Sequence, residues 1–249
     1  MPFIYDYVGA HDQETYDLEN RIADPERRIE QFIESVASLD GKVVADIGAG
    51  GGYHACRFAE IAAHVYAVEP APKMLAQCHL RLASQQASNV SVLAANAENI
   101  PLRDECVDVV HSRFAYFFGP ERPATGARSC VPGIYEATRI LRPDGHFFIV
   151  DNCLVSGDFA RILSGYGYSR GHAERMQQEN DDFYASQGFR YTTVESKWAA
   201  HDRASLRRVM AMEFGAESVD AIMRELPGSR LSYHYRLYYL RKPFTASST

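Results

Sequence analysis

The chain has 249 residues, of which 46% are hydrophobic and 23% are charged. This length and balance are typical of one large globular domain, and they exclude disordered, collagen-like and disulfide-scaffold proteins. No stretch approaches the roughly 18 apolar residues of a membrane-spanning helix, and the first residues lack the basic-then-apolar layout of a secretory signal. We therefore expect a cytoplasmic protein without a membrane partner.

The charged residues and the cysteines argue against two further classes. There are 26 Lys and Arg against 32 Asp and Glu, a net charge of −6, and the basic residues are scattered along the chain. A nucleic-acid-binding protein normally has a basic excess or a basic stripe, so no nucleic-acid partner is expected. The five cysteines are widely spaced and form no C-x-x-C motif. Free thiols in a reducing compartment are expected, and no zinc site.

The first predicted helix has Asp24 as its N-cap and Pro25 at its first position, and it ends at Asp40-Gly41. After it, runs rich in β-branched residues alternate with helical patterns. The predicted strands are residues 42–48, 64–69, 90–96, 107–114 and 146–152. One helix is predicted after the glycines that follow the first strand, ending at about residue 63, and two more are predicted over 70–86 and 129–141. This alternation predicts βαβ units and a doubly wound α/β fold with a mostly parallel sheet.

The pattern changes beyond residue 157. The predicted elements there are a polar helix over 171–187, a sixth strand over 189–198, helical stretches over 202–213 and 218–226, and a last strand over 231–240. The expected organisation is an N-terminal helical cap over residues 1–40 and a domain over 41–249. A helical insertion at about 199–230 precedes the last strand of that domain.

A glycine-rich loop, Asp46-Ile47-Gly48-Ala49-Gly50-Gly51-Gly52, joins the first strand to its helix. Such a loop lets the backbone approach a ligand closely, at the edge of the sheet where open α/β folds bind ligands. Glu69 ends the second strand, where a carboxylate can accept hydrogen bonds from both hydroxyls of an adenosine ribose. A dinucleotide dehydrogenase needs a third glycine where this chain has Tyr53. A smaller zwitterionic cofactor fits better, and Asp46 is placed to organise the loop and hold its amino group.

Four segments in this order resemble the class I S-adenosylmethionine-dependent methyltransferases, in their UbiE-like branch of small-molecule enzymes. The segments are VVADIGAGGG, VYAVEPAPKML, ANAENIPLRDECVDVV and RILRPDGHFFIVD, which together cover about residues 42–151. The resemblance implies a seven-stranded sheet whose last strand runs antiparallel between the fifth and sixth. It also implies transfer of a methyl group from S-adenosylmethionine to the O, N or C atom of a small organic acceptor, leaving S-adenosylhomocysteine.

Carried over position by position, the resemblance implies a set of cofactor-binding residues. It places the methionine part of the cofactor at the loop and beside the end of the fourth strand, the ribose at the second strand, and the adenine between that strand and the third. The residues in that order are Asp46, Gly48, Ala49, Gly50, His111, Glu69, Pro70, Met74, Asn96 and Ala97. Family members usually have Asp where Asn96 stands. An amide oxygen still accepts a hydrogen bond from an exocyclic amine, so contact is expected at reduced strength.

Two side chains are candidates for catalysis. His111, at the carboxyl end of the fourth strand, is either a general base or a hydrogen-bonded structural or cofactor-contacting histidine. Tyr116, in the aromatic segment FAYFF, either lines the acceptor pocket or packs in the core. Asp151-Asn152 resembles the magnesium-binding pair of catechol-type O-methyltransferases. Because residues 111–113 include no carboxylate, no metal is expected, and the pair is expected to line the pocket or to form a turn instead.

Two segments outside the motifs are candidates for covering the site. The resemblance implies that the N-terminal residues fold over the cofactor, with a tyrosine contact to its sulfonium; the candidates there are Tyr5, Tyr7, His11 and Tyr16. In the insertion, apolar side chains either roof the pocket or form a dimer surface; these are Leu206, Val209, Met210, Met212 and Phe214. A monomer and a homodimer therefore both remain open.

Other functions remain open as well. An enzyme of this fold can bind the same cofactor without transferring methyl, as a cyclase or decarboxylase does, and a non-catalytic binding module is a further alternative.

Overall fold

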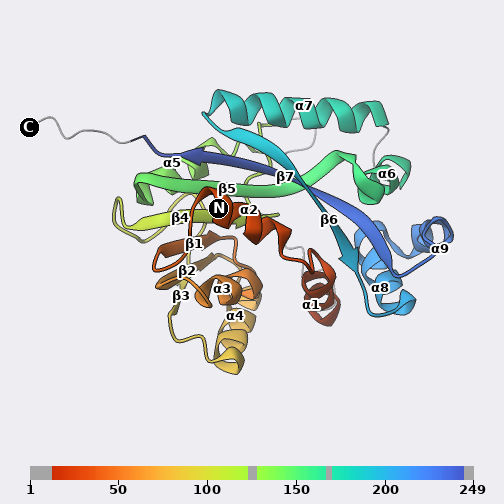
Figure 1. Ribbon diagram of the computed structural model, residues 1–249, viewed down its shortest axis with the longest axis horizontal. Helices are drawn as coiled ribbons and strands as arrows, with labels where there is room; N and C mark the ends of the chain where they lie inside the picture. Colours follow the sequence, from red (N-terminus) through yellow and green to blue (C-terminus); the bar gives the residue numbers. More distant parts are fainter. Residues whose placement is uncertain (1–12, 123–127, 167–169, 244–249) are drawn as a thin grey trace, which may run out of the picture.

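The computed structural model describes residues 13–122, 128–166 and 170–243 (Figure 1). Within them, one sheet has the strand order β3-β2-β1-β4-β5-β7-β6. Its strands are β1 (Val43–Ile47), β2 (His64–Glu69), β3 (Val90–Ala94), β4 (Val107–Arg113), β5 (Leu141–Ser156), β6 (Arg190–Ala199) and β7 (Arg230–Arg241). Strands β1 to β5 pair in parallel, and β7 pairs antiparallel with both β5 and β6. The predicted seven-stranded, mostly parallel sheet is confirmed.

Helices cover both faces of this sheet (Figure 1). They are α1 (Gln13–Ile22), α2 (Arg28–Val36), α3 (Tyr53–Ala59), α4 (Pro72–Gln85), α5 (Val131–Ile140), α6 (Gly157–Tyr166), α7 (Arg170–Ser186), α8 (Arg203–Phe214) and α9 (Ala216–Glu225). One hydrophobic cluster packs α2, α3, α6, α8 and α9 against the sheet, and a second packs α5 and α7 against it. None of the helices among these residues is long and apolar enough to cross a bilayer.

The first predicted helix begins later than its capping signal indicated. Asp24 lies in a turn with φ +50, and α2 starts at Arg28. The buried carboxylate of Asp24 still accepts hydrogen bonds from the backbone N–H groups of Arg28, at 3.0 Å, and Ile29, at 2.9 Å. The aspartate therefore caps the helix from one turn away. The sequence pattern did not predict α1 or α6.

The fifth strand is longer than predicted because its turn signal forms an irregularity inside it. Leu141 pairs with Val107 and His146 with Val109, so residues 142–145 stand out of the register between them. Asp144 in this segment has φ +65. The Arg142-Pro143-Asp144-Gly145 sequence therefore bends the strand rather than separating it from α5.

Candidate active site

A cavity of about 1410 Å³ opens at the carboxyl ends of β1, β2 and β4, the position where open α/β sheets bind ligands. Its wall includes nine of the ten residues that the resemblance assigns to a cofactor; these are Asp46, Gly48, Ala49, Gly50, Glu69, Pro70, Met74, Asn96 and Ala97. The tenth, His111, lies behind the wall. The structure thus gathers residues of three strand ends around one space.

The glycine loop has no room for side chains at two positions. Gly48 has φ +76, and a Cβ placed there would lie 2.2 Å from the Cβ of Ala115. Gly50 has φ +54, and its Cβ would lie 2.9 Å from the Tyr16 hydroxyl. Glycine is therefore required by conformation and by space, and the backbone itself forms the wall.

Glu69 is held by the backbone on both sides. One carboxylate oxygen accepts a hydrogen bond from the Gly50 N–H at 3.0 Å, and the other accepts one from the Ala71 N–H at 2.8 Å. Burial raises the pKa of Glu69, and these two hydrogen bonds oppose the rise. Because each carboxylate oxygen has a second lone pair, the oriented group can also accept from two adjacent hydroxyls of a ligand.

His111 and Asp46 form a buried pair on neighbouring strands. The His111 Nδ1 atom lies 2.8 Å from one Asp46 oxygen, and His111 is 1% exposed. Its ring packs edge-on against Phe58, with centroids 4.8 Å apart. The second Asp46 oxygen is buried and has no hydrogen-bond partner among the described residues. This position suits His111 for orienting Asp46 toward the cavity, and it does not suit a base that must reach an acceptor.

Tyr116 lines the cavity, and its hydroxyl donates a hydrogen bond to Glu98 at 2.7 Å. Burial and this carboxylate raise the pKa of Tyr116. Glu98 belongs to the loop after β3, the same loop that includes Asn96 and Ala97. The structure therefore links Tyr116 to the loop after β3, which also lines the cavity.

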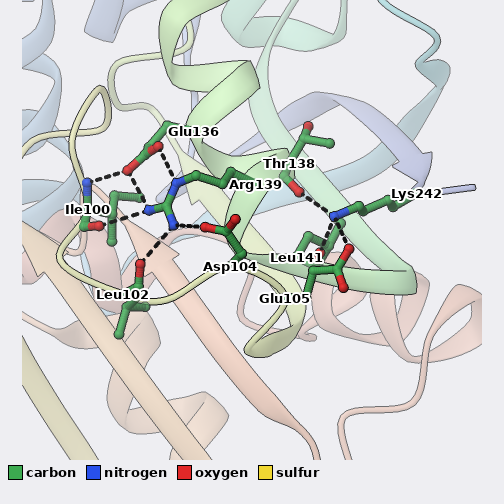
Figure 2. A network of polar contacts seen from close by, with 9 residues as sticks. All are labelled: Ile100, Leu102, Asp104, Glu105, Glu136, Thr138, Arg139, Leu141 and Lys242. Atoms are coloured by element: carbon green, nitrogen blue, oxygen red, sulfur yellow. Dashed lines mark hydrogen bonds and ion pairs between the residues drawn. The ribbon is translucent and has the colours of Figure 1, made fainter. Parts of the chain in front are cut away.

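Arg139 of α5 anchors the same loop (Figure 2). Its guanidinium donates to the backbone carbonyls of Ile100, at 3.0 Å, and Leu102, at 2.8 Å, and also to Asp104. Glu136 completes the network, since it accepts from both Arg139 and the Ile100 N–H. No sequence pattern indicated this role for Arg139, because its partners are mostly backbone groups of a distant loop.

Helix α1 forms the part of the cavity wall next to the glycine loop. Tyr16 on this helix lines the cavity beside Gly50. Arg81 of α4 ties the helix down by donating to Asp17 at 2.6 Å and to the Gly51 carbonyl at 2.7 Å. The other aromatic candidates, Tyr5, Tyr7 and His11, lie outside the described residues.

The apolar side chains of the insertion were expected either to roof the pocket or to form a dimer surface, and the structure packs them into the core instead. Leu206, Val209 and Met210 of α8 are fully buried in the core, and Met212 and Phe214 pack against the same cluster. None of these five apolar side chains, all in the described part of the chain, lines the cavity; the α8 residue that does is Glu213. Helix α8 thus contributes a single acidic residue, near its C-terminal end, to the wall of the cavity.

The second half of the cavity is built from elements that are distant in sequence. Side chains from α1, β4, β5, α6, β6, α8 and β7 meet there, and they include Glu19, Arg113, Phe114, Asp151, Phe159, Trp198, Glu213 and Tyr233. Sequence reasoning missed most of them, because only the packing of α1 and α8 over the strand ends brings them together. Asp151 lines the cavity, which is one of the roles expected for the Asp151-Asn152 pair in place of metal binding.

Asp151 is half-buried in this second half, and burial raises its pKa to about 6, although the Asn152 N–H and the charge of Arg122 oppose the rise. The raised folded-state pKa means that folding favours the protonated carboxyl. The free energy of unfolding of the wild-type protein therefore falls as the pH rises from about 4 through about 6. Above that range the carboxyl is ionised, and this loss of stability has reached its full size.

We expect Asp151→Asn to increase the free energy of unfolding by about 1–2 kcal/mol at pH 8. The increase should fade as the pH falls through 6 toward 4, because the wild-type carboxyl is then neutral as well. Urea unfolding at several pH values measures this difference. A stability gain that is the same at pH 4 and pH 8 would contradict the titration of Asp151 as its cause.

Comparison with known proteins finds a match to a family described as methyltransferase domain, over residues 45–149. The tRNA U34 carboxymethyltransferase of Hahella chejuensis is 30% identical over 130 residues, which are 52% of this chain and 37% of that protein. The arsenite methyltransferase of Halobacterium salinarum is 29% identical over 119 residues, 46% of this chain and 28% of that protein. The chain therefore spans well under half the length of these relatives.

Solved structures share the whole fold at lower identity. An S-adenosylmethionine-dependent methyltransferase from Aquifex aeolicus aligns with a TM-score of 0.58 at 18% identity, covering 94% of this chain and 98% of the other. The YcgJ protein from Bacillus subtilis also aligns at 0.58, with 17% identity, 88% of this chain and all of the other. The matches in sequence lie over the glycine loop and the strands that follow it, and the matches in structure extend beyond them.

Proposed function

We propose that this chain is a class I S-adenosylmethionine-dependent methyltransferase and that it transfers a methyl group from S-adenosylmethionine to a small organic acceptor. The match to a methyltransferase domain over residues 45–149 and the fold shared with solved methyltransferases support this proposal. The donor would occupy the half of the cavity at β1, β2 and β3. The acceptor would occupy the half between β4, α1 and α8. The matched segments cover only 37% and 28% of the two curated relatives, so the activity of this chain is proposed and is not inferred from theirs.

The observation that carries this proposal is the second oxygen of Asp46, which is buried at the cavity and lacks a partner among the described residues. A buried carboxylate oxygen without a partner is costly, and a cationic amino group would satisfy it. The carboxylate of Glu69 can accept hydrogen bonds from two ligand hydroxyls. At Gly48 and Gly50 the backbone borders space in the cavity that a Cβ atom would fill. An amino acid joined to a nucleoside meets all three demands, so the residues fit the cofactor.

When bound, S-adenosylmethionine supplies a methyl group activated by a positively charged sulfur. The chain's own contribution is to hold an acceptor lone pair in line with that methyl group and to exclude water. Carboxyl groups line the acceptor half, namely Asp151 and the neighbouring Glu19 and Glu213, and an ionised one among them can take a proton from the acceptor. We assign His111 to orienting Asp46 and Tyr116 to the cofactor side, so neither transfers a proton to or from the acceptor.

Two features favour a small acceptor over a nucleic acid. The acceptor half of the cavity is lined by several helices, and the chain has a net charge of −6. Helices α1, α6, α7 and α8 stand around the acceptor half, which suits a molecule that enters whole. We also propose a cytoplasmic location, supported by five cysteines that are all buried and unpaired. The protein would act as a monomer or a homodimer, and no metal would take part.

Calorimetry with S-adenosylmethionine and S-adenosylhomocysteine tests the cofactor half directly. We expect both to bind in the micromolar range and NAD not to bind. Incubation of the protein with isotopically labelled cofactor and a native extract, followed by mass spectrometry, should then reveal a labelled small molecule. Absence of binding by both adenosyl compounds would overturn the proposal; binding without any labelled product would identify a non-catalytic module.

A further inference from the structure

The acceptor half of the cavity contains two carboxyl groups that face each other across two helices. Glu19 comes from α1 and Glu213 from α8, and both line the cavity. The Glu19 and Glu213 side chains are hydrogen-bonded to each other. Burial, together with the negative charge of Glu213, raises the pKa of Glu19 well above its usual range. Because an ionised carboxylate can only accept hydrogen bonds, a hydrogen bond between two carboxyl groups requires one proton, which the two side chains share inside the cavity.

The charged group beside this pair in the described part of the chain is Arg113. Its guanidinium is held between the rings of Phe114 and Tyr235, at 5.3 and 4.8 Å from their centroids, and it donates to the Tyr235 hydroxyl at 3.1 Å. Its charge lowers the pKa of Glu19. One fixed cation thus stands beside two acids, and the shared proton balances the second negative charge.

The surroundings of the pair are apolar and aromatic. Phe159, Trp198 and Tyr233 line this half of the cavity and pack on one another, with ring centroids 4.4 to 5.3 Å apart. The other titratable groups near the pair are Tyr16, on the same helix as Glu19, and Tyr233 and Tyr235 of β7. Burial raises the pKa of each of these tyrosines, so they bring no further charge.

We propose that this half of the cavity binds the methyl acceptor as a small protonated amine, whose ammonium group takes the place of the proton shared by Glu19 and Glu213. The aromatic wall suits such a ligand, because organic cations are attracted to aromatic surfaces. An anionic acceptor would meet Glu213, and a neutral alcohol would leave the shared proton in place. This inference rests on the proposed function and adds the class of acceptor to it.

The proton balance of the reaction follows from this placement. Binding of the ammonium group releases the shared proton to solvent. The ammonium then passes one N–H proton to the pair, which frees the nitrogen lone pair. The nitrogen forms a bond to the methyl carbon, and the electron pair of the broken carbon–sulfur bond stays on sulfur. The product is a methylated ammonium ion, and the pair holds its single proton again.

The test is a binding experiment, independent of turnover. The protein is saturated with S-adenosylhomocysteine and titrated by calorimetry with matched probes: benzylamine, benzyl alcohol and benzoate, then butylamine, butanol and butanoate. We expect each amine to bind at least about tenfold more tightly than its alcohol and its acid. Repeating the amine titration in buffers of different ionisation heat should show release of up to about one proton.

Glu213→Gln removes the charge and keeps a hydrogen-bond acceptor for Glu19. We expect this variant to lose the preference for amines and the proton release, while binding of S-adenosylhomocysteine stays within about twofold. Glu19→Gln should act in the same way. The matched control is Glu14→Gln, since Glu14 is an exposed residue of α1 whose carboxylate pairs with Arg208 of α8 at 3.1 Å; it should keep both properties.

Three results would overturn the inference: equal or tighter binding of the alcohols or acids, no binding of any amine, or an amine preference that survives Glu213→Gln. If the wild-type protein does not bind S-adenosylhomocysteine at all, the proposed function is wrong instead. Melting curves of each variant separate these outcomes from a failure to fold.

Discussion

Replacement of Glu69 by Ala should lower the affinity for S-adenosylhomocysteine by at least about 100-fold, because hydrogen bonds to a charged group contribute roughly 1.5–3 kcal/mol each. The carboxylate is the group placed to accept from two ligand hydroxyls. It also orients the Gly50 and Ala71 N–H groups, at 3.0 and 2.8 Å. Its loss therefore removes the ligand contacts and loosens the loop that faces the ligand. Calorimetry well below the melting temperature measures the change.

Two further variants make this result specific. Glu69→Gln retains one acceptor oxygen but turns a donor toward either Gly50 or Ala71, so we expect an intermediate loss of affinity. Glu60→Ala removes an exposed carboxylate that pairs with Arg27, and it should leave the affinity unchanged. Wild-type affinity in Glu69→Ala would show that the ribose does not lie at the end of β2.

Replacement of Gly48 by Ala should destabilise the protein by about 3 kcal/mol and abolish cofactor binding. Two costs add. The position has φ +76, which disfavours a side chain, and the new Cβ would lie 2.2 Å from the Cβ of Ala115. Either the loop or the segment after β4 must move, and both line the cavity. Denaturant unfolding and calorimetry measure the two effects.

The two costs can be separated by matched variants. Gly41→Ala occurs at φ +66 with nothing within 4 Å of the new Cβ, so it should cost only about 1 kcal/mol. Combining Gly48→Ala with Ala115→Gly removes the clashing methyl group and should recover about 1–2 kcal/mol relative to the sum of the single changes. Simple additivity would show that steric contact with Ala115 is not the cause.

The cofactor half of the cavity was predictable because its residues are set by local motifs. Asp46, Gly48 and Gly50 follow one strand, and Glu69 ends the next. Parallel strands place their carboxyl ends at one edge of the sheet, so residues that follow those ends meet without any knowledge of the packing. The side-chain pairing of His111 could not be read in this way. Its partner Asp46 is 65 residues away and lies beside it only through the register of β1 and β4.

The sequence by itself determined the sheet, the glycine loop and the carboxylate that faces it, because strand periodicity and the chemistry of a tight turn act over a few neighbouring residues. The tertiary structure decided the acceptor half. Glu19, Trp198 and Glu213 belong to elements at opposite ends of the chain, and each has an ordinary local context. Only the packing of α1 against α8, above the ends of β4 and β7, places them in one cavity with Arg113. Desolvation and charge pairing in that shared space, rather than any local pattern, determine the protonation of Glu19 and Glu213.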